Sequence, residues 1–414
     1  MRTNTPPNGA FRGFGAPQVE FAAETHLNRI AERLGLGPDA IRERNVYRIG
    51  DTTPTGQVLG ESVAAEQVLR LAVDMSGFEA GRRETARRAA ERRGPDPSGR
   101  DRLRTTAGRT AAGIGLALGW HGAGFTGNGE VQLASVASVE VTEDGRIRVL
   151  AAQTEMGQGT KTTLPLMVAG ELGVPPEWVD YAAQDTAEVP DSGPTVASRT
   201  TMVVGGLCIE AARRLKAEVE ARQPGRPFRE VFRDDALEHG PTRIDQRFEP
   251  YPGVAFDDAT YRGDAYPAFG WAAAIASVDV DLDTGEVTVH DVVAVDDVGT
   301  AIHPILCEGQ VEGGTLQAVG YATIEEIKLV DGRYLNDRLA TYLIPTALDA
   351  PRIHAFLVEA PFSGAPHGAK GVGELPMDVP APAVVAAVRH ATGVRLDEIP
   401  ITPERLLRAL REAR

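Results

Sequence analysis

The feature that most constrains the fold is an internal echo between two segments of the chain. Residues 137–148 (ASVEVTEDGRIR) and residues 276–288 (ASVDVDLDTGEVT) each contain an alternating run, a turn with glycine and a second alternating run. Such runs, separated by turn residues, predict a β-hairpin in each segment. Each hairpin is followed by a glycine-bearing loop and a candidate helix. The echo predicts an α+β fold with two lobes on related plans; the alternative is two ordinary hairpins of similar sequence.

On this basis we divide the chain into three parts. Residues 1–104 form a helical connecting part that ends in an arginine-rich linker. Residues 105–245 form the first lobe, and residues 255–414 form the second. With 414 residues, the chain is long enough for two or three domains with proper cores.

The first part contains two predicted helices and one predicted surface connection. Residues 17–34 predict a helix opened by a proline, with Phe21, Ile30 and Leu34 on its buried face. The short segment PDAIRERN predicts a second helix. Within the arginine-rich residues 79–104, the run Gly-Pro-Asp-Pro-Ser-Gly predicts a connection on the surface.

Charge and cysteine content exclude several classes of function. A net charge of -15 argues against a nucleic-acid surface, which carries a basic footprint. No stretch reaches the ~18 apolar residues of a membrane span, so we expect a cytoplasmic protein without a membrane partner. Cys208 and Cys307 lie far apart and form no CxxC pair, which argues against disulfides, a zinc site or an iron–sulfur cluster. His121 and His303 are each isolated, which argues against a histidine-ligated metal.

Three glycine-bearing segments predict turns that present backbone N–H groups to an anion. They are residues 155–160 (EMGQGT), 191–201 (DSGPTVASRTT) and 309–314 (GQVEGG). A helix start adds a partial positive charge to such a turn. None of the three fits the dinucleotide or ATP phosphate loops. The second segment also carries hydroxyls, which predict either phosphate contacts or a capped helix start.

Six motifs, in this order along the chain, resemble the molybdenum-binding portion of the xanthine dehydrogenase and aldehyde oxidase family. The likeness of HGAGFTGNGE at 121–130 points to bacterial heterocycle-hydroxylating branches of that family. The resemblance implies two molybdopterin-binding lobes, the second of which carries the catalytic residue. The motifs are NGAFRGFGAPQ at 8–18, TEMGQG at 154–159, SGPTVAS at 192–198, DVGTAIHP at 297–304, GQVEGG at 309–314 and KGVGE at 370–374.

The resemblance also implies roles for single residues. Glu374 matches the catalytic base. Phe14 matches the aromatic residue that stacks on the substrate, and Trp120 and Phe125 are expected either to wall the same pocket or to pack in the core. The molybdenum is held by the dithiolene of the pterin, with no direct protein ligand. The residues implied to contact the cofactor are Phe11, Arg12, Gly13, Gly157, Gln158, Thr195, Val196, Ala197, Ser198, Thr200, Gln310, Lys370 and Gly371.

The implied reaction is hydroxylation of a purine or another N-heterocycle. In this family a glutamate takes a proton from a Mo–OH group, the oxygen attacks an electron-poor carbon, and hydride passes to the Mo=S sulfur. The cofactor is molybdopterin or its cytosine dinucleotide form. The alternatives are an aldehyde or acyl-CoA substrate, and a truncated homologue without catalytic activity.

Finally, the resemblance implies partner chains. Complete large subunits of the family extend further at the amino end, so either a separate chain carries that half or the reading frame is truncated. Because this chain has no cysteine cluster, a [2Fe-2S] subunit and an FAD subunit are expected to carry the electrons away. The remaining partner is a small-molecule substrate.

Overall fold

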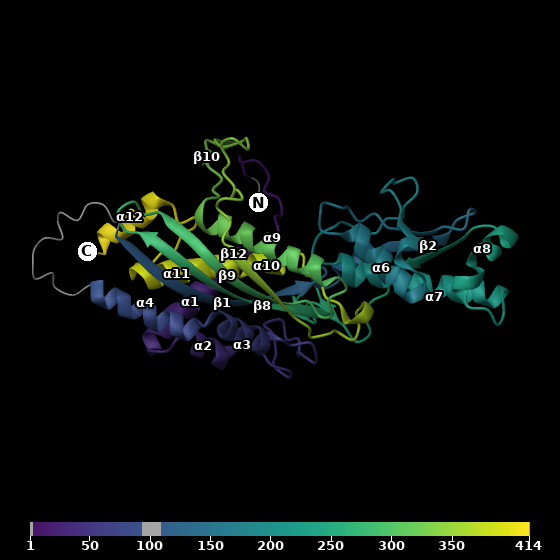
Figure 1. The fold of residues 1–414 in the computed structure, drawn as a ribbon, viewed down its shortest axis with the longest axis horizontal. Helices are drawn as coiled ribbons and strands as arrows, with labels where there is room; N and C mark the ends of the chain where they lie inside the picture. Colours follow the sequence, from purple (N-terminus) through teal and green to yellow (C-terminus); the bar gives the residue numbers. More distant parts are fainter. Residues whose placement is uncertain (1–2, 93–108, 414) are drawn as a thin grey trace, which may run out of the picture.

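Two four-stranded sheets organise this computed structural model, which describes residues 3–92 and 109–413. The sheets belong to two lobes that lie end to end, so the molecule is elongated (Figure 1). The fold is mixed α+β, as the hairpin echo predicts. The surface connection expected at residues 94–99 lies outside the described residues.

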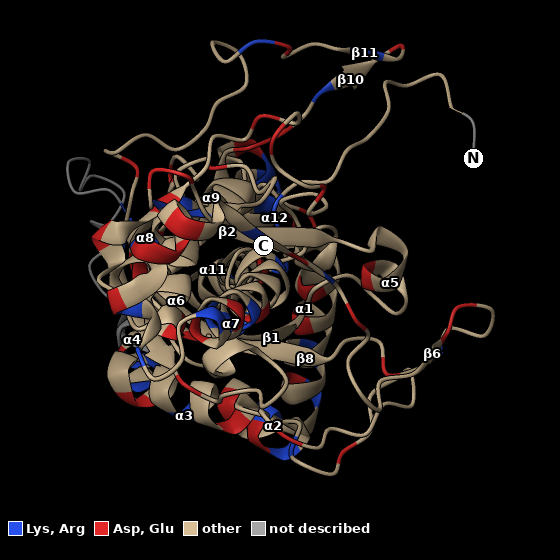
Figure 2. Cartoon of the chain, turned by 90° about the vertical axis from the view of Figure 1, so that its right-hand side faces the viewer, with Lys and Arg blue, Asp and Glu red and all other residues tan. Residues whose placement is uncertain are grey.

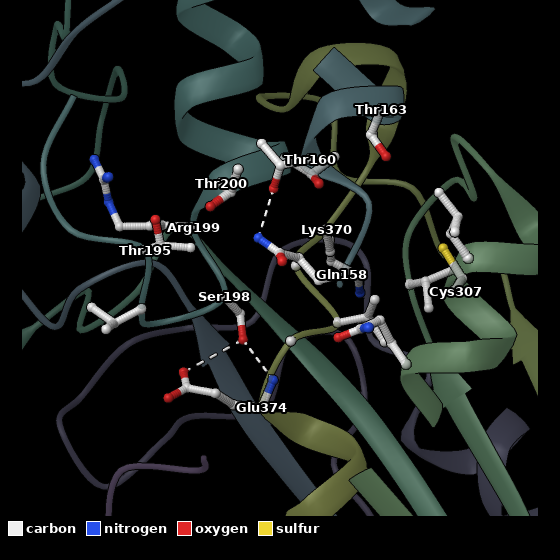
Figure 3. A pocket seen from close by; sticks show the side chains of 18 of the residues that line it. Gln158, Thr160, Thr163, Thr195, Ser198, Arg199, Thr200, Cys307, Lys370 and Glu374 are labelled. Atoms are coloured by element: carbon white, nitrogen blue, oxygen red, sulfur yellow. Dashed lines mark hydrogen bonds between the residues drawn. The ribbon is translucent and has the colours of Figure 1, made fainter. Parts of the chain in front are cut away.

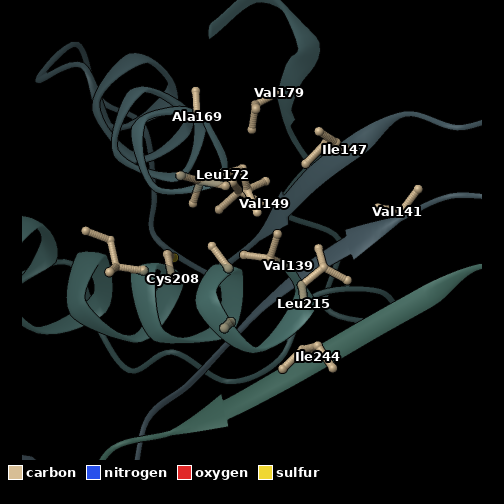
Figure 4. Packing of buried hydrophobic residues seen from close by; sticks show 14 of the residues in the cluster. Val139, Val141, Ile147, Val149, Ala169, Leu172, Val179, Cys208, Leu215 and Ile244 are labelled. Carbon is tan, nitrogen blue, oxygen red and sulfur yellow. The ribbon is translucent and has the colours of Figure 1, made fainter. Parts of the chain in front are cut away.

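The smaller lobe has the sheet order β4-β3-β2-β5. Strands β2 and β3 form the first predicted hairpin, with Val139 opposite Val149. Helices α6 and α7 pack on the sheet, and the buried side chains of Leu172 and Leu215 complete its core (Figure 4). The elements are β2 (Val136–Val141), β3 (Ile147–Leu150), α6 (Thr160–Leu172), η2 (Pro176–Trp178), β4 (Val179–Tyr181), the π-helical turn η3 (Thr200–Val204), α7 (Gly205–Arg222), α8 (Phe228–His239) and β5 (Thr242–Arg247).

The larger lobe has the sheet order β1-β8-β9-β12, and helices cover both faces. Ala272 and Ala274 of β8 pack in the core with α9, α10 and α11, whereas Trp271 and Ala273 pack with α3. Burial on both faces explains the nearly continuous apolar run in this strand. The elements are α1 (Ala16–Leu34), α2 (Pro38–Asn45), α3 (Ala65–Ser76), α4 (Phe78–Arg92), β1 (Thr110–Ala123), β8 (Ala268–Asp281), β9 (Val287–Asp297), α9 (Pro304–Thr323), β12 (Arg352–Val358), α10 (Leu375–Asp378), α11 (Pro380–Thr392) and α12 (Pro403–Glu412).

The two sheets share one connectivity. In each, an antiparallel hairpin (β2-β3 or β8-β9) leads into a helix (α6 or α9) and then into a strand parallel to the second hairpin strand (β4 or β12). A fourth strand, β5 or β1, pairs antiparallel with the first hairpin strand. Strand β1 lies in residues 105–245, which we assigned to the first lobe. It pairs with β8 over its whole length, so it belongs to the larger lobe, and the smaller lobe lies between β1 and β8 in the sequence.

Glycines in β1 explain how closely α11 packs on the sheet. A Cβ atom on Gly113 would lie 2.0 Å from the carbonyl oxygen of Ala387, and one on Gly115 would lie 2.2 Å from that of Ala383. Only residues without a Cβ atom permit this approach of helix backbone to strand backbone.

Helix α1 forms where predicted, but its expected buried face is only partly correct: Phe21 packs against the core of the larger lobe, whereas the other two residues are exposed. Ile30 is 37% exposed and Leu34 is 64% exposed. The inward positions include Glu24, which forms a buried ion pair with Arg42 of α2 at 2.6 Å. Because a paired carboxylate occupies the inner face, an apolar stripe could not locate it.

Shorter elements complete the chain. The segment that carries β10 and β11 and the extended start of the described chain, before residue 8, both stand clear of the body (Figure 2). Charged positions of both signs are interspersed on helices such as α2 and α7. Over residues 3–92 and 109–413, no helix has the length and apolar character needed to cross a bilayer. The short elements are α5 (Gly129–Leu133), β6 (Phe256–Asp257), β7 (Arg262–Gly263), β10 (Leu329–Val330), β11 (Arg333–Tyr334) and η4 (Pro366–Gly368).

Candidate active site

Two neighbouring cavities lie where loops of the two lobes meet. The larger has a volume of about 600 Å³, and loops of both lobes, the amino-terminal segment and α9 line it. The smaller has a volume of about 330 Å³. Both volumes are in the range of small-molecule sites. Phe14 and Glu374 line both cavities, so the two share a wall.

Every residue predicted for the site lines one of these cavities. The fold brings together segments as far apart in sequence as Arg12 and Gly373, whose side chain and carbonyl group are hydrogen-bonded. The larger cavity is lined by Phe11, Arg12, Phe14, Gly157, Gln158, Thr195, Val196, Ser198, Thr200, Gln310, Lys370, Gly371 and Glu374. The smaller is lined by Gly13, Phe14, Trp120, Phe125, Ala197 and Glu374.

The hydroxyl-rich loop before η3 is organised by Gln153, a buried residue that the sequence did not single out. Thr195 and Thr200 both donate hydrogen bonds to Gln153 Oε1, at 3.3 and 2.7 Å. Gln153 Nε2 in turn donates to the carbonyl oxygens of Ser192 and Gly193. Because buried polar groups are costly unless paired, this network fixes both hydroxyls at the cavity wall.

A buried ion pair between Arg199 and Glu130 also stabilises this loop. Arg199 contacts Glu130 at 2.7 Å, and its side chain is fully buried. Ala197 and Ser198, next to it, have left-handed backbone angles (φ of 56° and 51°) that cost about 1–3 kcal/mol each. The π-helical turn η3 begins at Thr200, and such turns occur often at functional sites. The ion pair therefore holds a strained loop in place.

The glycine loop before α6 is closed by Gln158. Its Oε1 accepts a hydrogen bond from the Met156 N–H at 2.7 Å. Its Nε2 donates to the Thr154 carbonyl at 2.7 Å and to the Thr160 hydroxyl at 2.8 Å (Figure 3). Both amide hydrogens are thus engaged within the loop, which shapes the cavity wall at this point.

Arg12 connects the amino-terminal segment with two walls of the larger cavity. Its Nε donates to the Gly373 carbonyl at 2.5 Å, and its other nitrogens donate to Gln317 Oε1 and to the carbonyl and side chain of Gln310. Burial lowers the pKa of Arg12, although the charges of Asp296, Glu374 and Asp378 oppose this. Arg12 thereby fixes the backbone next to Glu374.

The third predicted glycine turn is wrong, because residues 309–314 lie inside helix α9. Glycine serves here to make room. A Cβ atom on Gly314 would lie 3.1 Å from the Arg12 guanidinium carbon and 2.6 Å from Pro376. Gly314 therefore allows Arg12 and α10 to approach the helix.

Lys370 lines the larger cavity, but its ammonium group points to protein partners. It forms a fully buried ion pair with Asp297. It also donates hydrogen bonds at 2.8 Å to the Phe269 carbonyl and to the Ser62 hydroxyl. These contacts anchor the segment that leads to Glu374.

Glu374 lies at the start of α10 and is 7% exposed. Its backbone N–H donates to the Ser198 hydroxyl at 3.0 Å, and that hydroxyl lies 3.5 Å from Glu374 Oε2 (Figure 3). His121 Nε2 also faces Oε2, at 3.3 Å. The carboxylate is therefore held on one side by both lobes.

His121, isolated in the sequence, contacts two acidic residues in the fold. Its Nδ1 lies 2.7 Å from Asp378 Oδ2. Burial disfavours the charged ring, but hydrogen bonds to Asp378 and Glu374 and their charges outweigh it and raise the pKa of His121 to about 10. No local spacing could have shown this, because the partners lie more than 250 residues away along the chain.

The smaller cavity has aromatic walls. Trp120 stacks on Trp271 with ring centroids 5.6 Å apart, and the Phe269 ring lies 4.7 Å from Trp120. Trp120 therefore both packs in the core and lines the cavity. Phe125 and Tyr266 complete the aromatic lining. Among the described residues, no group of three or more His, Cys, Asp or Glu side chains could hold a metal ion directly.

Comparison with known proteins gives one consistent result. The family described as a molybdopterin cofactor-binding domain matches residues 90–351, and a second such family matches residues 1–46. A protein of Bacillus subtilis, named as a probable subunit of xanthine dehydrogenase, is 32% identical over 99% of this chain and 54% of its own length. The chain thus spans about half the length of this curated relative.

Solved structures agree with this result. The aldehyde oxidoreductase from Desulfovibrio gigas matches 97% of this chain and 42% of its own, with a TM-score of 0.82 and 30% identity. Quinoline 2-oxidoreductase from Pseudomonas putida 86 matches 98% of this chain and 53% of its own, with a TM-score of 0.82 and 28% identity.

Proposed function

Since the chain belongs to the xanthine dehydrogenase and aldehyde oxidoreductase family of molybdopterin-binding proteins, we propose that it forms the catalytic, carboxyl-terminal part of a molybdenum hydroxylase. The observation that carries the proposal is the position of Glu374 in the wall between the two cavities. A base in this wall reaches both a group bound in the larger cavity and a substrate bound in the smaller one.

The larger cavity fits the molybdenum cofactor by its volume and by the chemistry of its walls. Amide and hydroxyl groups of Gln310, Thr195, Ser198 and Thr200 surround it, together with the glycine loop at Gly157. A Cβ atom on Gly157 would meet nothing within 4 Å, so the backbone there is open to a ligand. Neutral polar walls suit a pterin, and a metal held by dithiolene sulfurs needs no protein ligand.

Within this site, Glu374 accepts a proton. Ser198 and His121 both contact Oε2 of Glu374. Oε1 is therefore the oxygen that remains to accept a proton from a group bound in the cavities. When bound, the molybdenum cofactor supplies the two-electron oxidation of the substrate. Ser198 and Arg12 keep the carboxylate and its backbone in place, and enclosure limits the access of water, so proton transfer takes place at a fixed atom.

The smaller cavity favours a flat aromatic substrate. Phe14, Trp120 and Phe125 line it, and its volume of about 330 Å³ is small. Planar rings pack well between aromatic side chains. We therefore propose a purine or another N-heterocycle as substrate, in line with the name of the quinoline-oxidising relative. An aldehyde is the second candidate, since the Desulfovibrio gigas enzyme is equally similar in fold.

We also propose that the active enzyme contains further chains. The Bacillus subtilis relative is named as a subunit, and this chain covers 54% of its length. A polypeptide equivalent to the part of this relative that the chain does not cover would close the larger cavity. Iron–sulfur and FAD subunits would remove the electrons.

The test is Glu374→Gln in the assembled enzyme. Loss of the base should reduce turnover by about 10²–10⁴-fold, with molybdenum and pterin content unchanged. Glu312→Gln, on the exposed surface of α9, is the matched control and should retain full activity. Wild-type turnover by a metal-replete Glu374→Gln enzyme would rule out the proposed base.

A further inference from the structure

Three buried titratable groups form a line that leads away from the cavities. Glu374 contacts His121, and His121 contacts Asp378, at 3.3 and 2.7 Å. The three side chains are 10%, 13% and 0% exposed, respectively. They come from β1 and from α10 and its first flanking residue, so packing of α10 against the sheet creates the arrangement.

The two ring nitrogens of His121 have separate partners. Each ring nitrogen faces a different carboxylate, which requires a hydrogen on both nitrogens if both contacts are hydrogen bonds. A ring with both hydrogens is an imidazolium. The raised pKa of His121, about 10, agrees with this charge state at neutral pH.

We propose that His121, held by Asp378, is a positioning residue that orients Glu374 and sets a fixed positive charge against it. This role rests on the proposed function of Glu374 as the base. Two carboxylates buried close together repel each other, and a cation between them offsets that repulsion. Burial raises the pKa of Asp378, and His121 opposes this rise. The N–H of His121 also engages Oε2, so that Oε1 is the oxygen directed to the reaction.

Other charged groups surround this line without replacing it. Glu20 of α1 is near enough for His121 to affect it; burial and Glu24 raise the pKa of Glu20 to about 8. Arg12 interacts electrostatically with Asp378 and Glu374. Tyr266 lines the same cavity as His121. None of these is hydrogen-bonded to His121, so among the described residues Asp378 and Glu374 define its charge state.

The charge of His121 should also appear in stability. Its pKa rises from 6.5 to about 10 on folding, so the stabilisation is complete below pH 6.5. It is lost as the pH rises toward about 10, where the folded protein gives up the proton. Asp378→Asn should flatten this part of the dependence of unfolding free energy on pH.

The direct test is an NMR titration of the full chain, with any copurifying subunits, labelled with ¹³C in the histidine rings. The His121 signal, assigned by its loss in His121→Gln, should remain that of a charged ring above pH 8. In Asp378→Asn its midpoint should fall by about one unit or more. Asp279→Asn, which alters the exposed pair of Asp279 and His290, should not move it. A His121 signal that titrates near pH 6.5, or that ignores Asp378→Asn, would overturn the proposal.

A second measurement uses the assembled enzyme. His121→Phe should lower kcat by about tenfold to hundredfold with little change in KM, and should move the acidic limb of the pH–rate profile to higher pH. His121→Gln, which still offers an N–H to Glu374, should recover part of kcat. Unchanged kcat and pH profile in His121→Phe would contradict the role. The NMR titration does not depend on turnover. An active Glu374→Gln enzyme would therefore refute the proposed base, whereas the charge of His121 is tested by the titration alone.

Discussion

The two lobes share one connectivity but bring different chemistry to the cavity between them. The smaller lobe presents neutral groups, such as the hydroxyls of Thr195 in the loop before η3 and of Thr200 at the start of η3. The larger lobe presents charge, through Arg12, Glu374 and the segment anchored by Lys370. The smaller lobe therefore supplies neutral polar groups, and the larger lobe supplies the charged groups, including the proposed base Glu374.

The largest expected effect comes from removing one partner of a buried ion pair in the larger lobe. Lys370→Met leaves Asp297 buried without its partner, which should lower the free energy of unfolding by about 3–5 kcal/mol. Denaturant unfolding measures the change. Lys328→Met, at an exposed position, is the control and should change stability by less than about 1 kcal/mol. Equal stability of the two variants would show that charge has no structural role in the larger lobe.

The next test asks whether the lobes are separate cooperative units. Leu215→Ala removes a fully buried side chain from the core of the smaller lobe and should cost about 3 kcal/mol. Hydrogen exchange should then speed up in β2, β3 and α6 but not in β1, β8 and α11. Leu237→Ala, 80% exposed on α8, should have little effect. Equal loss of protection in both lobes would show that they unfold together.

The smallest effect concerns a single hydroxyl. Thr200→Val removes the donor to Gln153 and should cost about 1 kcal/mol of stability. If the loop also holds the cofactor, the purified enzyme should contain less molybdenum. Thr162→Val, on the exposed side of α6, serves as control. Undiminished molybdenum content in Thr200→Val would remove this hydroxyl from the proposed cofactor site.

The sequence predicted features that depend on neighbouring residues. Both hairpins and helix α6 formed where alternation and glycine turns indicated. The turn predicted at residues 309–314 was wrong because glycine occurs both in turns and at close helix contacts. Only the packing of Arg12 against α9 shows that glycine makes room for a contact here. Likewise, Glu24 occupies the inner face of α1 because Arg42 meets it there.

Motifs indicated the residues that line the two cavities, but they did not indicate the contacts that support those residues. Glu374 and the hydroxyl loop stand in recognisable patterns. His121, Gln153 and the pair of Arg199 and Glu130 gain their roles only from partners that the fold brings near. Contacts across so many residues leave no periodicity or spacing in a single sequence.

The pairing of β1 with β8 has a consequence for synthesis. Strand β1 leaves the ribosome before the whole smaller lobe, and it must wait until the chain reaches residue 268 to find its partner. Until then an apolar strand has an open edge, which invites pairing with other chains. The smaller lobe can fold during this interval, because its sheet is complete at β5. The order of translation thus allows the smaller lobe to fold first and leaves the larger lobe, with Glu374, to be assembled last.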